Sequence, residues 1–314
     1  MIRTTARILA PIAFCAPLAM PAAAQEDAAH GLDKFLHPGA GIEVWASTDS
    51  DDTDVIKVMG KGYWDFEGRD SYKGIAVEKA WFTPSGTATK EDERAYLDLA
   101  DKAGENWLWQ ARIGTDGDTV LGSASIRSKD WSKSFFVERE IIESRRGVDE
   151  GIYYTFAGAS FDFPVDDRNV FTAMAGVQEF TGTNERLHLR GNYIHVVKPE
   201  WGLSAQLRGR YYHSTTPGEF DYFSPRDYVE VLPVVQLRRF TGTGWMYQLA
   251  GGYGAQYAKG SGWQESRFAD LRVESPANSH KLTAFAQLQY SNTSITGGLN
   301  YDYVLGRLGV SFGF

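Results

Sequence analysis

The end of the chain alternates between two kinds of side chain. Read in steps of two, positions 304 to 314 carry Val, Gly, Leu, Val, Phe and Phe, whereas the positions between them include Arg307 and Ser311. Soluble chain ends usually fray, so an alternation that continues to a final aromatic residue indicates a strand with one face in lipid. Its other face would line a lumen, and Phe314 would end the strand that closes a barrel. An edge strand of a soluble β-sandwich is the alternative.

The same two-residue rhythm recurs through most of the chain. Turn-forming stretches such as PVDDR, TGTN, KPEW, TGTG and SPANS separate the alternating segments. The predicted strands are residues 55–66, 72–82, 107–115, 119–128, 133–143, 151–163, 169–180, 185–196, 202–213, 227–239, 245–257, 263–273, 282–291 and 301–314. The fold class is therefore all-β, an antiparallel transmembrane β-barrel of about 14 strands. A weaker alternation at 41–48 leaves 16 strands as an alternative.

One stretch breaks the rhythm. Residues 90–104 read KEDERAYLDLADKAG, which is highly charged with a thin apolar stripe. This pattern predicts a helical connection near 85–105, inserted in a barrel that occupies residues 53–314. Residues 25–52 would be an N-terminal periplasmic segment, with 41–48 as its strand candidate.

The first 24 residues have the pattern of a secretory signal. Arg3 and Arg7 precede an apolar run, and Ala22, Ala23 and Ala24 precede Gln25, which predicts a signal peptide of residues 1–24 that is cleaved after Ala24. The apolar run is too short for a spanning helix. The only cysteine falls inside this segment, so disulfides and thiolate metal sites are not expected in the remainder.

The amino-acid composition limits which classes of partner the chain can have. Beyond the signal, 30 basic and 40 acidic residues give a net charge of −10, which argues against a nucleic-acid partner. Aromatic residues make up 14% of the chain, yet the mean hydropathy is −0.34. Alternation between a lipid-facing side and a wet side would produce this combination, with outer-membrane lipid as the surrounding partner.

Charged residues share the predicted lumen face. Arginine on the other face, among leucines and tyrosines, would cost roughly 2–4 kcal/mol each near the bilayer midplane, and same-face residues of paired strands become neighbours. The predicted pore-lining residues are Arg186, Arg190, Arg208, Arg210, Tyr212, Glu138, Glu140, Glu230, Arg238, Asp270 and Arg272. They indicate a mixed-charge conduit for a hydrated or anionic solute. The alternative is a salt-bridge network that fills a closed barrel.

Counting strands back from a periplasmic C-terminus assigns the connections to the two sides of the membrane. Residues 145–150, 181–184, 214–225 and 292–300 fall on the extracellular side. The longest, STTPGEFDYFSP, carries Tyr222, Phe223, Ser224 and Pro225. This aromatic loop either caps the barrel or folds into it, or else has no role in transport.

Catalytic and cofactor signatures are weak. His213 and Ser214 would lie near the extracellular rim, where outer-membrane lipid hydrolases carry His and Ser. Adjacent residues of a strand point to opposite faces, whereas a triad needs the base to contact the hydroxyl. The histidines have no metal-ligand spacing, and no glycine-rich loop precedes a helix. We expect no catalytic residues, no metal and no cofactor.

Several segments resemble a known family. The motif Tyr222-Phe223-Ser224-Pro225, with Pro233 in the strand that follows, resembles the C-terminal barrel of bacterial exopolysaccharide (cellulose) export proteins. The stretch 184–214 and the ending DYVLGRLGVSFGF are similar in style to those barrels and to the poly-N-acetylglucosamine export porin. The terminal Phe314 resembles the closing strand of bacterial outer-membrane barrels, which the barrel insertion machinery reads. The similarity covers about the last 180 residues.

This resemblance implies a polysaccharide-associated barrel in the outer membrane of a Gram-negative bacterium. The exporters carry a periplasmic array of tetratricopeptide repeats, which this sequence lacks, so a separate periplasmic repeat protein is an expected partner. The predicted function is a passive export channel for exopolysaccharide or a related hydrated solute, not an enzyme. A structural or adhesive barrel with a filled lumen, and a rim-active lipid hydrolase, are the alternatives.

Overall fold

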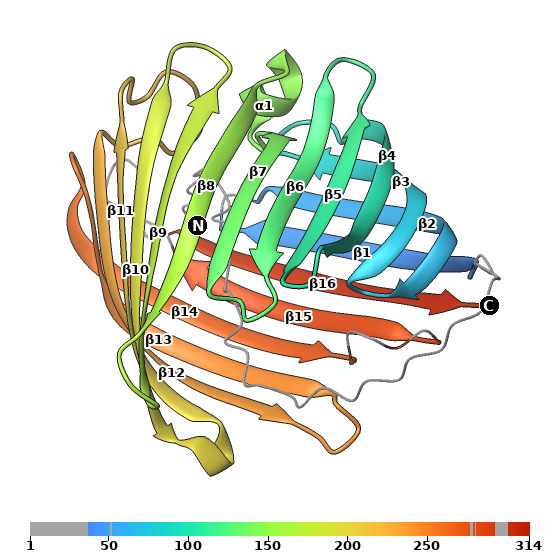
Figure 1. Ribbon diagram of the computed structural model, residues 1–314. Helices are drawn as coiled ribbons and strands as arrows, with labels where there is room; N and C mark the ends of the chain where they lie inside the picture. Colours follow the sequence, from blue (N-terminus) through green and yellow to red (C-terminus); the bar gives the residue numbers. More distant parts are fainter. Residues whose placement is uncertain (1–36, 51, 277–278, 280, 293–300) are drawn as a thin grey trace.

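The alternating segments form one antiparallel sheet that closes on itself (Figure 1). The computed structural model describes residues 37–50, 52–276, 279, 281–292 and 301–314, so the predicted signal peptide lies outside the described residues. Each strand pairs with the strands that precede and follow it in the sequence, and β1 pairs with β16 to close the barrel. The all-β barrel prediction is confirmed, with 16 strands as the correct count.

Most strands have 9 to 15 residues and are joined by short turns. Their bounds are β1 Gly39–Asp49, β2 Asp54–Gly68, β3 Ser71–Thr83, β4 Lys90–Ala103, β5 Trp107–Thr115, β6 Val120–Ser128, β7 Lys133–Ile141, β8 Tyr153–Pro164, β9 Asn169–Phe180, β10 Glu185–Lys198, β11 Leu203–Ser214, β12 Asp227–Phe240, β13 Met246–Ala258, β14 Gly262–Glu274, β15 Thr283–Asn292 and β16 Asp302–Gly313. The helices are α1 (Arg145–Glu150) and the 3-10 turn η1 (Pro199–Trp201).

Two strands, β1 and β4, account for the difference between the 16 strands of the structure and the 14 predicted from the sequence. The weak segment 41–48 lies within β1, so the barrel begins at Gly39 rather than at residue 53. The prediction of a helical connection near 85–105 is wrong, because Lys90–Ala103 is strand β4, paired with β3 and β5.

The sequence of β4 is compatible with a strand once its interior partners are known. Arg94 and Asp98 are buried and point inward, whereas Ala95 and Leu97 are exposed on the outer face. Inward charges are stable here because residues of other strands pair with them, and such partners are invisible in a local sequence window.

The first and last strands close the barrel. β1 and β16 pair from Gly39↔Gly313 to Asp49↔Tyr303, and the Phe314 N–H donates to the Pro38 carbonyl at 2.8 Å. We call the rim that holds these chain ends the terminal rim and the opposite one the loop rim. Helix α1 lies at the loop rim (Figure 1).

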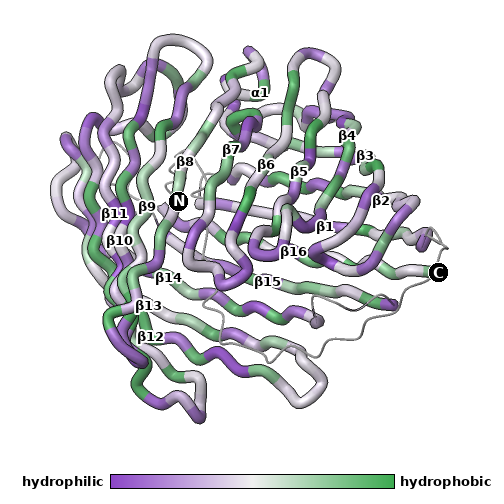
Figure 2. The backbone as a smooth tube through the Cα atoms, viewed as in Figure 1, coloured by the Kyte–Doolittle hydropathy of each residue, from purple (hydrophilic) through white to green (hydrophobic). Residues whose placement is uncertain are grey.

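The outer surface is apolar along the strands. Leu189, Leu207, Val235 and Leu308 are 45%, 48%, 60% and 50% exposed, and hydrophobic and hydrophilic positions alternate along each strand (Figure 2). A soluble protein rarely exposes so continuous an apolar surface, whereas a barrel in lipid requires it. In the described residues, no helix has the length and apolar character needed to cross a membrane.

Candidate functional site: the interior of the barrel

The interior on the β1–β8 side is bridged by charged side chains from strands that are not neighbours. A first charge network joins Glu43 of β1 to Lys61 of β2 at 2.8 Å and to Arg307 of β16 at 3.1 Å. Arg112 of β5 pairs with Asp98 at 3.2 Å and lies 3.8 Å from Glu43. Four strand steps of ~4.8 Å separate β1 from β5 along the wall, so this contact crosses the interior.

A second charge network lies nearer the loop rim. Arg94, whose side chain is fully buried, contacts Glu78, Asp92 and Glu140 at 3.2, 2.6 and 2.8 Å. Lys57 of β2 reaches Glu140 of β7 at 3.8 Å. Each buried charge is therefore compensated by opposite charges, which is the condition under which charges are tolerated away from water.

An apolar cluster fills the space beside the second network. Its buried members come from β2, β3, β4, β6, β7 and β8, and Trp45 of β1 and Val148 of α1 pack against it. They are Val55, Met59, Ala76, Ala80, Phe82, Tyr96, Leu121, Ile141 and Tyr153. This side of the interior is thus packed as a protein core.

The wall formed by β10, β11 and β12 has a different character. Its inward positions carry five arginines and a single carboxylate, that of Glu230. We call the five arginines the arginine wall: Arg186, Arg190, Arg208, Arg210 and Arg238. They run from the loop rim, near Arg186, to the terminal rim, near Arg238.

The register brings like charges together within this wall. Arg190 lies directly opposite Arg210, and Arg208 lies opposite Asn192. Glu230 contacts Arg210 at 3.2 Å. Like charges directly opposite in a sheet are destabilising, and the interaction of Arg190 with the Glu138 carboxylate of β7 offsets part of this repulsion.

Aromatic rings support several guanidinium groups. Arg186 lies 4.4 Å from the Tyr212 ring, Arg210 lies 4.8 Å from the Tyr228 ring, and Tyr212 and Tyr228 stack at 4.7 Å. Arg208 lies 4.9 Å from the Phe268 ring of β14. Both tyrosines are almost completely buried, so they orient the arginines by cation–π contact.

The remaining predicted lining residues also lie on the inner face. Asp270 is buried and accepts from Gln248 and Gln287 at 3.0 and 2.7 Å. Glu138 accepts from the Tyr154 hydroxyl at 3.2 Å. Arg272 pairs with Glu274, and Glu140 belongs to the second charge network. The structure therefore brings Arg186, Arg190, Arg208, Arg210, Tyr212, Glu230 and Arg238 together on one wall, and Glu138 of β7 interacts electrostatically with Arg190.

The connection between β11 and β12, residues 215–226, folds over the loop rim. Tyr222, Phe223, Ser224 and Pro225 are all buried. Tyr222 stacks on Phe180 at 4.5 Å, and the Phe223 carbonyl accepts from Arg186 at 2.8 Å. This loop therefore covers the upper end of the arginine wall.

Polar contacts fasten the same loop to its neighbours. Glu219 accepts from the backbone N–H groups of Thr183 and Asn184 at 2.7 and 2.9 Å. Asp221 accepts from the Ser144 hydroxyl at 2.5 Å and from the Arg146 N–H at 2.9 Å, both at the start of α1.

The tyrosine of this loop is held as a neutral phenol. Burial raises the pKa of Tyr222, and this effect outweighs the lowering caused by the hydrogen bond from Asn184 and by the positive charge of Arg186. Asn184 donates to the Tyr222 hydroxyl at 2.8 Å.

The residues considered for hydrolysis do not form a site. His213 lies on the outer face and contacts Asp227 at 2.8 Å. Ser214 is buried on the inner side, where it accepts from Arg186 at 3.1 Å. The imidazole and the hydroxyl therefore occupy opposite sides of the wall.

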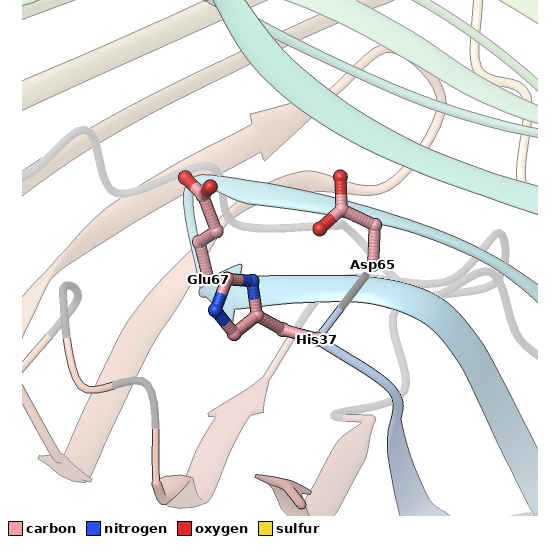
Figure 3. A group of neighbouring side chains, drawn as sticks. All are labelled: His37, Asp65 and Glu67. Carbon is pink, nitrogen blue, oxygen red and sulfur yellow. The ribbon is translucent and has the colours of Figure 1, made fainter. Parts of the chain in front are cut away.

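Three side chains at the terminal rim lie close enough to share a cation. His37 precedes β1, and Asp65 and Glu67 belong to the end of β2, with ligand atoms within 4.8 Å of one another (Figure 3). His37 and Glu67 are exposed, and the Lys73 ammonium already pairs with Asp65 at 3.1 Å. We assign no ion to this cluster, because Lys73 supplies the positive charge that Asp65 requires.

Sequence reasoning missed the two charge networks. Arg94 and Asp98 lie in the stretch predicted as helical, and Glu43 lies in the weakly alternating segment. The alternation Ala95, Leu97, Leu99 against Arg94, Tyr96, Asp98 was the available signal. It was obscured by the high density of charge.

The fold is similar to that of solved outer-membrane proteins. A bacterial polysaccharide outer membrane secretin superposes with a TM-score of 0.61 at 12% identity, covering 90% of this chain and 100% of that one. Pseudomonas aeruginosa OprD gives a TM-score of 0.42 at 10% identity, covering 91% and 97%. Acinetobacter baumannii OccAB2 gives 0.43 at 8% identity, covering 90% and 100%.

No protein-family model matches the sequence, and no curated protein is significantly similar to it in sequence. The chain therefore resembles an outer-membrane β-barrel protein in fold, and the superposition on the secretin carries this conclusion.

Proposed function

We propose that the protein is a passive outer-membrane channel that exports an exopolysaccharide or a related hydrated solute. The observation that carries the proposal is the division of the barrel wall into an apolar exterior and an inner face that carries five arginines on β10, β11 and β12. In lipid, such an exterior anchors the barrel, while a polar inner wall offers many weak contacts to a moving solute. The fold similarity to a polysaccharide outer membrane secretin supports the choice of solute class.

The proposed passage follows the inner face of β9 to β15, where Arg190, Arg208 and Arg238 are only partly buried and two smaller apolar clusters pack beside them. The β1–β8 side is occupied by the two charge networks and the larger apolar cluster. Transport in this proposal is driven by polymer synthesis or by a gradient elsewhere. Residues 1–24 would direct export across the inner membrane, and the C-terminal strand would be read by the insertion machinery. A periplasmic repeat protein would dock at the terminal rim.

A structural or adhesive barrel is the second candidate. Two observations favour it: charged contacts that cross the interior, and a loop that covers the loop rim. Small barrels without a channel are filled in this way.

Conductance in planar bilayers separates the two candidates. We expect discrete current steps from the purified full chain, larger or more frequent when residues 214–225 are replaced by a short Gly/Ser linker. The matched control replaces residues 166–168, a turn at the terminal rim, with the same kind of linker. A protein that migrates as a folded barrel on unboiled gels but never conducts, with or without residues 214–225, would be a filled barrel.

A further inference from the structure

The apolar outer surface ends in charged residues toward the loop rim. On β3, β7 and β9, the outward position that follows a valine carries Lys79, Arg139 and Glu179, respectively. Charge on a lipid-facing position is destabilising in a depth-dependent way, so these positions mark where each strand leaves the hydrocarbon. Arg139 is outward because its neighbours Glu138 and Glu140 bond with groups inside the barrel.

Arg139 differs from other outward cations in this half of the barrel. Lys79 lies 2.6 and 2.9 Å from two glutamates of β4, and Arg267 of β14 lies 3.0 Å from Glu265. Arg139 instead donates to the Thr155 hydroxyl at 2.9 Å and lies 5.3 Å from the centre of the Tyr153 ring. Among the described residues, no carboxylate lies within 4 Å of its guanidinium nitrogens.

Arg139 and Thr155 present hydrogen-bond donors at one point on the outer surface. They lie directly opposite each other on β7 and β8, and both are partly exposed. A guanidinium has five N–H donors, of which Thr155 accepts one. Because Thr155 accepts this bond, its own hydroxyl hydrogen can point outward. The two side chains can therefore donate to different oxygens of a single oxyanion such as phosphate.

The depth of Arg139 favours an anion supplied by lipid. Its strand carries a second outward cation, Lys133, near the terminal rim, with Phe135 and Val137 between the two. The step from Lys133 to Arg139 covers ~20 Å along a tilted strand, whereas the apolar band of such barrels is ~25 Å tall. The guanidinium therefore lies at the inner edge of the headgroup layer, where a lipid phosphate would neutralise it.

We propose that Arg139 and Thr155 bind the phosphate of a glycolipid in the outer leaflet. This site rests on the proposed location in the outer membrane, with the loop rim outside, and not on conduction through the barrel. An acyl chain of the lipid would lie along Val137 and Ala157, which are opposite each other on the lipid side of the phosphate. Glu179, opposite Thr155 on β9, repels the phosphate and so directs it toward Arg139.

Arg139 and Lys133 provide a matched pair of variants on one strand. The purified barrel is incubated with lipid A that carries two phosphates, or with the same lipid after dephosphorylation, and bound lipid is counted by native mass spectrometry. Arg139→Gln should lower retention of the phosphorylated lipid about tenfold, the factor expected for one charge-assisted hydrogen bond, whereas Lys133→Gln should retain it like the wild type. Thr155→Val should lower retention about fivefold, and Glu179→Gln should raise it.

Migration as a folded barrel on unboiled gels controls for folding. If Arg139→Gln does not fold, Arg139→Lys keeps the charge without the guanidinium donors and should give intermediate retention. Equal retention in the folded Arg139 variants and the wild type, a greater loss in Lys133→Gln, or equal retention of lipid with and without phosphate would overturn this proposal. Current steps in planar bilayers should be the same in Arg139→Gln and in the wild type. Absence of current in every variant would remove the proposed channel and leave the lipid site standing.

Discussion

The contact between Asp221 and helix α1 should control how often the loop over the rim opens. The Asp221 carboxylate accepts one hydrogen bond from Ser144 and one from the Arg146 N–H, at 2.5 and 2.9 Å. Ser144 is also the N-cap of α1, where its hydroxyl accepts from Gly147. The carboxylate therefore links residues 215–226 to a helix between β7 and β8.

Asp221→Asn keeps the size of the side chain and removes its charge. A hydrogen bond to a charged group contributes ~1.5–3 kcal/mol, and a neutral one ~0.5–1.5 kcal/mol. Because Asp221 is partly exposed, we take about 2 kcal/mol for the two bonds together. This raises the ratio of open to closed loop about 30-fold.

Hydrogen exchange in detergent or nanodiscs measures this ratio directly. Amides of the loop and of α1 should exchange about 30-fold faster in Asp221→Asn, and the current trace should show more frequent transitions. Asp118→Asn is the control, because it removes a charge from an exposed position at the same rim. Equal exchange in the wild type, Asp221→Asn and Asp118→Asn would refute the assignment of Asp221 as the fastening residue.

Three other substitutions test the barrel itself. Leu207→Arg places a cation on the lipid face near the middle of β11 and should cost roughly 2–4 kcal/mol, which lowers the fraction that migrates as a folded barrel on unboiled gels; Leu207→Ala should lower it much less. Arg94→Ala leaves Glu78, Asp92 and Glu140 without their shared partner and should lower the free energy of unfolding by about 3–5 kcal/mol in urea titrations. An unchanged urea midpoint would contradict a stabilising role for the second charge network. If the insertion machinery reads the terminal residue, Phe314→Ser should reduce assembly of the barrel in cells more than it reduces refolding in detergent. An equal reduction in both assays would assign Phe314 a packing role only.

The sequence predicted the wall of the barrel better than its contents. Alternation placed Arg190 and Arg210 on one face and Leu189 and Leu207 on the other, because a one-residue error would have put charge in lipid. Those assignments depend on neighbouring residues alone. The register that puts Arg190 opposite Arg210 is seen only in the structure, where the connection between β10 and β11 sets it.

Contacts across the interior could not be predicted in this way. Glu43 and Arg112 are separated by three intervening strands, and Lys57 and Glu140 by four. Such pairs depend on how tightly the wall curves, which the two-residue period does not encode. The charges of β4 were misread for the same reason, since their partners come from other strands.

The seam between β1 and β16 joins segments about 260 residues apart in sequence. Until the last strand arrives, the growing sheet has two unpaired edges, and each edge can pair with another chain. The contact between β1 and β16 also closes the largest loop in the chain, and contacts between such distant segments form the most slowly. Folding of this protein should therefore depend on periplasmic factors that shield the edge of β1, and their depletion should yield aggregates rather than misthreaded barrels.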